Sequence, residues 1–373
     1  MRKKIPKGNR KQMNKDVFLS KLVDNSSSKN IFDEMRKEMR PLIMWGAGSM
    51  SVSVRKLLEK EDIRIDAFWI DNCEVDTNID GIPIMNMEDL MQKYEKINVV
   101  FGHSKYELAD EISKKYSFIN KCYCLVNVCY GQWKRIEYNF VKEHIEEYMT
   151  SYNMLSDERS KECFIAYLNC KMSEDFRYLL GCCDEKASYF SNPFFRINAD
   201  EWYVDIGAYN GDTIREFLDT VDEFSGNIYA IEPENESFEE LSRMIEEMEV
   251  DNVELFQCGC WNENTVLKFA QKEESSSIDA EGTQELQVYT LDSLLDKQRV
   301  TMIKINFLYG VAETILGATE ILKTYHPKLA ITVGFDEWGI IRIPQIIKEI
   351  DSDYKIYLRY AAAMPARLIL FAC

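Results

Sequence analysis

The sequence lacks the long apolar run that a membrane-spanning helix requires. No stretch of its 373 residues approaches the ~18–20 consecutive apolar residues that cross a bilayer. The N-terminus (Met1–Lys4) is basic, but no apolar segment of the kind found in secretory signals follows it. We therefore expect a cytoplasmic protein without a membrane span.

Histidine is scarce, and the cysteines are not spaced as metal ligands usually are. The histidines are His103, His144 and His326, and none of the eleven cysteines forms a C-x-x-C pair. Zinc sites commonly use such short spacings. An odd cysteine count without a signal sequence also disfavours a disulfide framework. We expect reduced thiols and no metal site.

Basic residues are outnumbered by acidic ones. The chain has 45 Lys and Arg against 63 Asp and Glu, which gives a net charge of −18. Residues 1–40 hold twelve basic and five acidic residues, and removing this +7 leaves −25 on residues 41–373. An acidic body repels a phosphate backbone, so we expect no nucleic-acid partner. The basic leader leaves open a contact with RNA or anionic lipid.

The length and the residue pattern predict two α/β lobes. A chain of this length exceeds the usual size of one domain. Strands that alternate with helices are typical of a parallel sheet covered by helices. We expect the following parts: a basic leader and helix over 1–40, a small Rossmann-like domain over 41–130, a helical connector over 131–195, and a second domain over 196–373.

The second domain has the strand pattern of one particular sheet. The expected strands are 202–207, 227–231, 253–257, 302–306, 329–334, 355–359 and 367–372, and the expected helices are 213–220, 237–248, 291–295 and 313–323. Seven residues separate the last two strands, which suits a hairpin and is too short for a parallel crossover. Five parallel strands and a terminal hairpin predict the seven-stranded, mostly parallel sheet of class I methyltransferases. Residues 266–270 and 286–289 are expected to form an accessory hairpin flanking residues 275–277.

A carboxylate and a turn with two glycines follow the first of these strands. Glycine lets a backbone approach a ligand, and a helix N-terminus presents free N–H groups. S-adenosylmethionine carries a carboxylate, which the amides can meet, and cationic groups, which Asp205 can meet directly or through water. The spacing differs from the G-x-G-x-x-G of a dinucleotide turn. The candidate residues are Asp205, Gly207, Ala208, Tyr209, Gly211, Asp212 and Thr213.

A second carboxylate stands where the next strand is expected to end. Glu232 follows the apolar run 227–231, and Pro233 after it stops the strand. An acidic residue at the tip of a second strand can accept hydrogen bonds from both hydroxyls of a ribose. We therefore add Glu232 and Pro233 to the candidate cofactor site.

Several segments in this order and spacing resemble the FkbM family of S-adenosylmethionine-dependent methyltransferases. The segments are Tyr189-Phe190, Asp200–Tyr203, VDIGAYNGDTI (204–214), YAIEPEN (229–235), LQVYTLDSLL (286–295), IKIN (303–306) and GATEIL (317–322). The resemblance spans roughly residues 185–373. It implies transfer of a methyl group from S-adenosylmethionine to an oxygen of a small molecule or glycan.

The sequence departs from the family on the acceptor side. The family segment I-K-x-D-I-E-G-A-E aligns so that Asn306 stands at its Asp position, with Leu308, Tyr309 and Val311 at its Glu, Gly and second Glu positions. Gly334-Phe335 stand at a Tyr-His position, and Arg359-Tyr360 at an Arg-His position. A hydroxyl acceptor must lose its proton to a base. The remaining candidates for a catalytic role are Asp336, Glu337 and Asn306.

A turn in the N-terminal lobe also invites a binding interpretation. WGAGSMS (45–51) and FWIDN (68–72) are similar to the small Rossmann-like domain that precedes some of these enzymes. The candidate nucleotide site comprises Gly46, Gly48, Ser49 and Asp71, although the third glycine of a dinucleotide turn is replaced by Ser51. Binding of a sugar-nucleotide-like acceptor, or packing and dimerisation into a homo-oligomer, are the alternatives.

Three functions therefore stay open at this point. The first is a methyltransferase that uses S-adenosylmethionine. The second is a non-catalytic binding or assembly protein with the same fold, which the replaced residues Asn306, Leu308 and Phe335 favour. The third is a nucleotide-dependent sugar-modifying enzyme or oxidoreductase that works through the N-terminal lobe.

Overall fold

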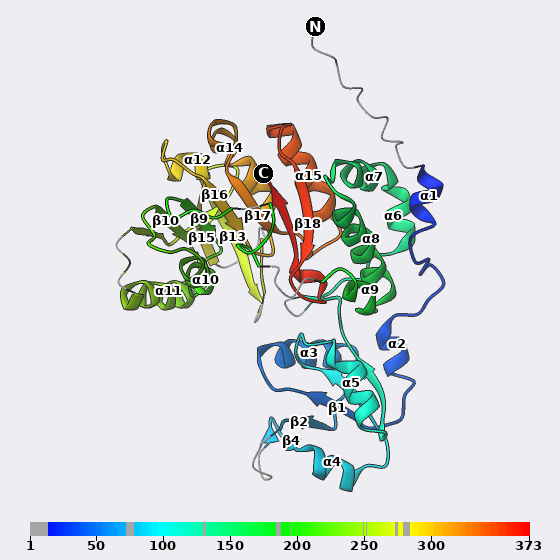
Figure 1. The fold of residues 1–373 in the computed structure, drawn as a ribbon. Coiled ribbons are helices and arrows are strands. Elements are labelled where there is room, and N and C mark those ends of the chain that lie inside the picture. Colours follow the sequence, from blue (N-terminus) through cyan, green and yellow to red (C-terminus); the bar gives the residue numbers. More distant parts are fainter. Residues whose placement is uncertain are drawn as a thin grey trace.

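Two mostly parallel sheets, one in each half of the chain, organise the molecule (Figure 1). The structure is a computed structural model. It describes residues 14–71, 78–129, 132–183, 188–194, 196–248, 250, 252–272, 275–278 and 284–373.

The first sheet has six strands in the order β3-β4-β2-β1-β5-β6. They are β1 (Leu42–Trp45), β2 (Ala67–Trp69), β3 (Asn78–Ile79), β4 (Ile82–Met85), β5 (Ile97–Phe101) and β6 (Ile119–Tyr123). All neighbours pair in parallel except β3 and β4. Every residue of β5 is buried, as expected for a central strand covered on both faces. The helices of this half are α1 (Lys15–Leu19), α2 (Ile31–Met35), α3 (Ser49–Lys60), α4 (Met87–Lys93) and α5 (Leu108–Lys115).

The second sheet has seven strands in the order β11-β10-β9-β16-β17-β19-β18. They are β9 (Trp202–Ile206), β10 (Asn227–Ile231), β11 (Val253–Phe256), β16 (Met302–Ile305), β17 (Lys328–Thr332), β18 (Ile356–Tyr360) and β19 (Leu368–Ala372). Only β19 runs antiparallel to its neighbours, between β17 and β18. The predicted seven-stranded methyltransferase sheet with its terminal hairpin is therefore confirmed.

The helices of the second half are α10 (Asp212–Thr220), α11 (Asn235–Met248), α12 (Leu291–Leu294), α13 (Val311–Leu316), α14 (Thr319–Tyr325) and α15 (Gly339–Ile350). The prediction of a single helix over 313–323 is wrong, because the helix is interrupted at Gly317, between α13 and α14. A Cβ on Gly317 would lie 1.9 Å from the carbonyl oxygen of Trp261, so the backbone passes too close for a side chain. Helix α15 was not expected from the sequence.

Two small sheets accompany the large ones. One contains β12 (Gly259–Cys260), β13 (Thr265–Lys272), β14 (Ser275–Ile278) and β15 (Gln284–Tyr289), and the other contains β7 (Val128–Cys129) and β8 (Gln132–Trp133). The predicted accessory hairpin corresponds to the antiparallel pair β13 and β15. Residues 275–277, which we expected only between its arms, form β14 and pair with β13.

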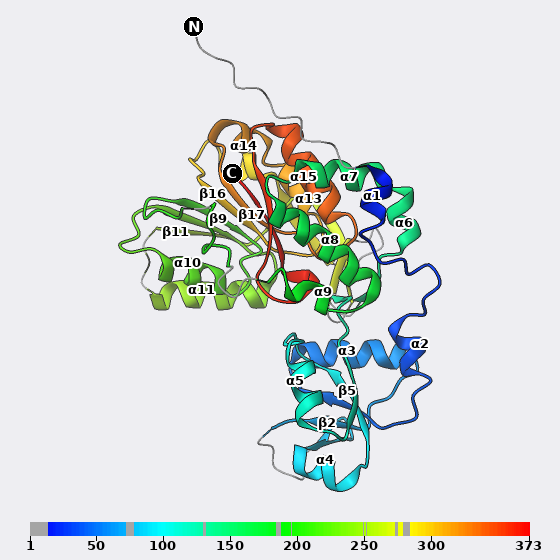
Figure 2. The same ribbon diagram turned by 45° about the vertical axis from the view of Figure 1, so that its right-hand side comes forward.

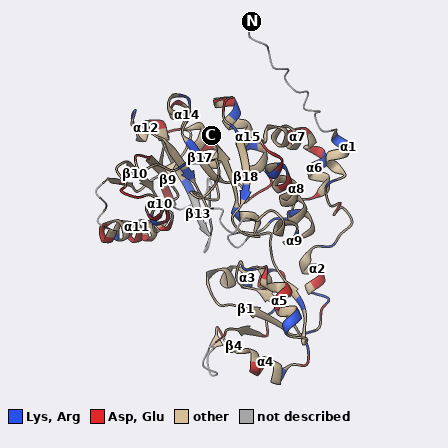
Figure 3. Cartoon of the chain, viewed as in Figure 1, with Lys and Arg blue, Asp and Glu red and all other residues tan. Residues whose placement is uncertain are grey.

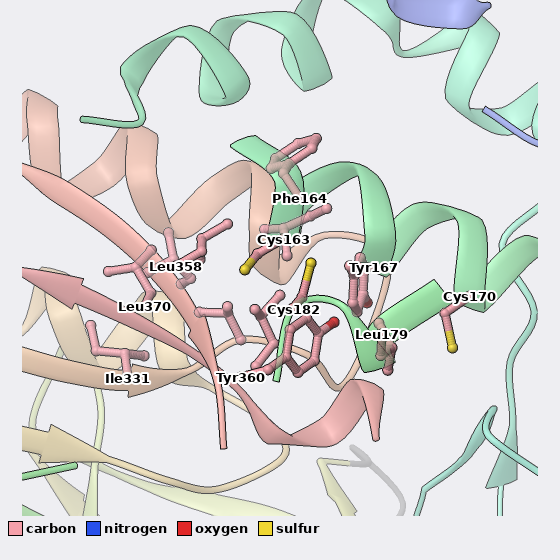
Figure 4. Close-up of a cluster of buried hydrophobic side chains, with 14 of the residues drawn as sticks. Cys163, Phe164, Tyr167, Cys170, Leu179, Cys182, Ile331, Leu358, Tyr360 and Leu370 are labelled. Atoms are coloured by element: carbon pink, nitrogen blue, oxygen red, sulfur yellow. The ribbon is translucent and has the colours of Figure 1, made fainter. Parts of the chain in front are cut away.

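Helices α6 (Tyr138–Glu143), α7 (Ile145–Met154), α8 (Glu158–Ser173) and α9 (Arg177–Leu180) connect the two sheets and cover the β18 side of the second one (Figure 2). The short 3-10 helix η1 (Pro365–Arg367) lies between β18 and β19. Figure 4 shows Cys163 and Tyr167 of α8 facing Leu358 and Tyr360 of β18, all fully buried. The connector and the second sheet therefore share one hydrophobic core.

No helix in the described part of the chain is long and apolar enough to cross a membrane.

Candidate functional site

The turn after β9 has a backbone that few residue types adopt without strain. Gly207 and Gly211 have φ values of 76° and 84°, and Tyr209 between them has φ of 51°. A tyrosine in this left-handed region costs about 1–3 kcal/mol, and such strain clusters at functional sites. A Cβ on Gly207 would lie 2.6 Å from the carbonyl oxygen of Asn306. Glycine therefore lets the turn pack directly against the end of β16.

Several amide groups of this turn are already used within the protein. The N–H groups of Gly207 and Ala208 donate to the carbonyl oxygen of Ile231, at 3.0 and 3.1 Å. The amide of Tyr209 donates to Glu232 Oε2 at 2.8 Å. These bonds tie the turn to the end of β10. They also differ from the expectation that these amides face the carboxylate of a ligand.

Glu232 lies at the tip of β10, beside the turn. Its side chain is 7% exposed, and its second oxygen, Oε1, accepts a hydrogen bond from the amide of Glu234 at 3.0 Å. Burial raises the pKa of Glu232, although the two backbone amides oppose this shift. Each carboxylate oxygen has a second lone pair, so Glu232 can still accept two further hydrogen bonds.

Asp205 is fully buried and already paired. Its Oδ1 accepts a hydrogen bond from Lys304 Nζ at 2.7 Å, and its Oδ2 accepts one from the Tyr203 hydroxyl at 2.9 Å. Burial raises the pKa of Asp205, and the Lys304 ammonium acts in the opposite direction. Direct contact between Asp205 and a cationic ligand, as the sequence suggested, would require this pair to open.

Lys304 is the residue of this site that sequence reasoning missed. It is 1% exposed, and its Nζ also donates to the carbonyl oxygen of Gly207 at 2.8 Å. It therefore links the strand that carries Asp205 to the turn itself. The available signal was a lysine within the otherwise apolar strand β16, whose register partner in β9 is Asp205. A charge in a buried strand requires a counter-charge nearby.

The remaining residues of the predicted cofactor site lie around the same turn. Asp212 is exposed at the start of α10, and its Oδ1 accepts the amide of Thr213 at 2.8 Å. Thr213 is buried. Pro233 is half-buried directly after Glu232. The phenol of Tyr209 is 57% exposed and is the large apolar group that the turn presents to solvent.

The catalytic candidates occupy two neighbouring strand ends. Asn306 follows β16, and its backbone N–H donates to the carbonyl oxygen of Ile206 at 3.1 Å. Asp336 lies three residues before α15, and its Oδ1 accepts the amides of Trp338 and Gly339 at 2.9 and 2.8 Å. The carbonyl oxygen of Glu337 accepts a hydrogen bond from the Tyr148 hydroxyl at 3.2 Å. The loop after β17 is thus anchored on the connector helices.

The candidate residues of the N-terminal lobe follow β1 and β2. Gly46 has φ of 101°, and its amide donates to the carbonyl oxygen of Trp69 at 3.0 Å. Gly48 is the N-cap of α3, which begins at Ser49. Asp71 Oδ1 accepts a hydrogen bond from the Trp69 indole at 3.0 Å. The structure therefore gathers these residues at the carboxyl ends of two adjacent strands.

Part of the chain that contains this site matches the model of a known protein family. Residues 205–350 match the model of the methyltransferase FkbM domain. This span of the chain is therefore similar to the methyltransferase FkbM domain. The matched span begins at Asp205 in β9, includes Glu232 and Lys304, and ends with α15. The resemblance found in the sequence is confirmed.

One solved structure shares the fold over almost the whole chain. Methyltransferase FkbM from Methylobacillus flagellatus KT covers 96% of this chain and 98% of its own, with a TM-score of 0.71 and 15% identity. An rRNA methylase from Streptococcus thermophilus covers 47% and 87%, with a TM-score of 0.31 and 16% identity. A precorrin-6y C5,15-methyltransferase from Geobacter metallireducens GS-15 covers 48% and 80%, with a TM-score of 0.32 and 13% identity. No curated protein sequence matches the chain.

Proposed function

We propose that this protein transfers a methyl group from S-adenosylmethionine to an oxygen of a small molecule or glycan. The observation that carries the proposal is the Glu232 carboxylate at the tip of β10, hydrogen-bonded to the turn after β9. S-adenosylmethionine supplies a methyl group on a sulfonium, and its ribose offers two hydroxyls. A carboxylate at a strand tip accepts such hydroxyls.

The residues of the turn suit this cofactor in part. Glu232 keeps two lone pairs for ribose hydroxyls, and Tyr209 presents an exposed ring beside it. Asp205 acts differently from our expectation in this proposal. Asp205 accepts a hydrogen bond from Lys304, and Lys304 donates another to the carbonyl oxygen of Gly207. Asp205 therefore positions the turn through Lys304.

Methyl transfer needs a positioned acceptor and a dry site more than it needs covalent help from the protein. Most of the acceleration of such a displacement comes from holding the reacting atoms about 3 Å apart, with water excluded. The side-chain amide of Asn306 can orient an acceptor hydroxyl but cannot take its proton. Asp336 and Glu337 are the candidates for that role. Asp336 Oδ1 already caps α15, which leaves Oδ2 for a proton.

The charge of the second half favours a small-molecule or glycan acceptor over a nucleic acid. Helix α11, which follows Glu232, contains five glutamates and one arginine, and acidic residues line much of it in Figure 3. A surface of this sign repels a phosphate backbone.

Calorimetry followed by an isotope assay tests the proposal. We expect the purified protein to bind S-adenosylmethionine at micromolar concentration and to transfer labelled methyl groups to a member of a glycan and small-molecule panel. Binding without transfer to any acceptor would favour the non-catalytic binding protein. Absence of binding at about 1 mM cofactor would contradict both.

A further inference from the structure

A cavity outside the FkbM domain lies where three distant chain segments meet. Its volume is about 470 Å³. It is lined by residues around α2, by residues 121–124 at the end of β6, and by residues 173–177 between α8 and α9. Strand β6 is the edge of the first sheet, so the cavity lies between that sheet and the connector.

Two ammonium groups at this cavity lie close enough to repel each other. Lys29 and Lys37 both line it, and neither forms an ion pair within the described part of the chain. The closeness of Lys29 is the main reason why the pKa of Lys37 is lowered. An anion placed between the two groups would replace this repulsion by attraction.

The rest of the lining offers both donors and acceptors to a polar ligand. Lys121 pairs with Glu34, and Arg177 pairs with Asp175, so these cations are neutralised. The carboxylates of Glu34 and Asp175 retain lone pairs that can accept hydroxyl groups. Tyr123 lines the same cavity, and its hydroxyl oxygen is buried without a hydrogen-bond partner. A buried polar group without a partner is costly, so a ligand that bonded it would gain stability.

One wall of the cavity is held rigidly. Glu174 adopts φ of 61° at the end of α8, and its side chain is buried. Its two oxygens accept hydrogen bonds from the amide of Ile31 and from the Trp133 indole, both at 3.0 Å. These bonds fix α2 against the connector, so the groups around the cavity are positioned before a ligand arrives.

We propose that this cavity binds a phosphorylated sugar. Its phosphate lies between Lys29 and Lys37, and its hydroxyls bond to Glu34, Asp175 or the Tyr123 hydroxyl. The phosphate of such a ligand carries negative charge that can pair with both lysines. Its hydroxyls can donate hydrogen bonds to the carboxylates. Because the cavity joins α2, β6 and the connector, binding also ties the first sheet to the connector helices. The site is independent of the proposed methyl transfer.

Calorimetry with the full chain tests this site, using glucose 6-phosphate as the probe. We expect glucose 6-phosphate to bind at least about tenfold more tightly than inorganic phosphate, and glucose alone to give no heat. We also expect it to raise the melting temperature, because it binds only the folded state.

The double variant K29A/K37A should weaken glucose 6-phosphate binding at least about tenfold and leave S-adenosylmethionine binding unchanged. The matched control is K60A, which removes an exposed lysine from the end of α3 in the same half of the chain. No binding at about 10 mM, or equal affinity in K29A/K37A, would overturn the site. Equal affinity for inorganic phosphate would overturn the assignment to a sugar.

Discussion

The buried Asp205–Lys304 pair is the residue-level feature on which the turn after β9 depends. Both side chains are almost completely buried, and Lys304 Nζ lies 2.7 Å from Asp205 Oδ1 and 2.8 Å from the carbonyl oxygen of Gly207. A buried pair of this kind need not stabilise a fold more than apolar residues would, but its rupture leaves an unpaired charge in the core. Its stronger contribution here is to hold the turn in one position.

The variant K304M should destabilise the protein by about 3–5 kcal/mol, because it leaves Asp205 buried without its cation. Urea denaturation of the full chain measures this loss. The pKa of Asp205, already raised by burial, should rise further in K304M. A carboxyl whose pKa is raised in the folded state stabilises that state most when protonated, so the deficit of K304M should shrink as the pH falls.

The control for this change is the double variant D205N/K304M, which removes both charges. It should be more stable than K304M alone, because no ionised group is then left unpaired. A loss below about 1 kcal/mol in K304M would show that Asp205 does not depend on Lys304.

The variant E232Q should weaken S-adenosylmethionine binding about tenfold, because an amide offers only one acceptor oxygen where the carboxylate offers two. The exposed Glu254 on β11 provides the control variant E254Q, which should bind normally. Burial raises the pKa of Glu232, so the binding form is lost as the pH falls through a value above the usual 4.5. Calorimetry across acidic pH should show this decline in the wild type. Equal affinity in E232Q would contradict the role of Glu232.

The sequence could place Glu232 because an apolar run ends directly before it. It could not assign the partners of Asp205, because these depend on the register between β9 and β16, strands that lie about a hundred residues apart. The same reasoning explains why the amides of the turn were expected to be free. Their bonds to Ile231 and Glu232 require the neighbouring strand to be in place.

At the scale of elements, the sequence predicted the sheet better than the helices that cover it. Each expected strand of the second sheet is present within one or two residues, because each is an apolar run that ends at polar or glycine residues. Helix α15 was missed because Pro344 lies inside it. Proline removes one hydrogen bond from a helix, yet four buried isoleucines of α15 pack against the core and keep it formed.

Helix α15 also has a specific N-terminal cap in Asp336. The variant D336A should lower the free energy of unfolding by about 1 kcal/mol, because the amides of Trp338 and Gly339 lose their acceptor. D336N should retain most of the stability, since asparagine caps helices equally well. Chemical denaturation distinguishes the two variants. If D336N keeps its stability but loses methyl transfer, Asp336 takes the acceptor proton as well, whereas equal losses in D336N and D336A would contradict the cap.

At the scale of the whole molecule, the connector joins the first sheet to the outer strand of the second. Arg359 of β18 reaches Asp157 at the start of α8, with Nη2 2.6 Å from Oδ2, and it also donates to Ser160 Oγ at 3.0 Å. The sequence aligned Arg359 with a position near the acceptor. The structure instead directs it to the connector, a contact that no local pattern could indicate.

The variant R359A should therefore destabilise the protein by about 1.5–3 kcal/mol, the usual value of hydrogen bonds to charged groups. Burial would raise the pKa of Asp157, but the bonds from Arg359 and Ser160 outweigh it and lower this pKa. The stabilisation should therefore be present above pH 4 and should disappear as the pH falls below the usual value of 3.8. Thermal denaturation of R359A and wild type at pH 7 and pH 3 measures both effects, and an equal difference at the two values would contradict the ion pair.

In the proposed function, the turn after β9 and Glu232 together hold S-adenosylmethionine. The most direct measurement is a crystal structure of the full chain with S-adenosylhomocysteine. We predict that the ribose hydroxyls lie within hydrogen-bond distance of the Glu232 carboxylate, with the amino-acid end of the ligand over the turn from Gly207 to Gly211. A ligand bound elsewhere, or a ribose that does not contact Glu232, would contradict this binding mode.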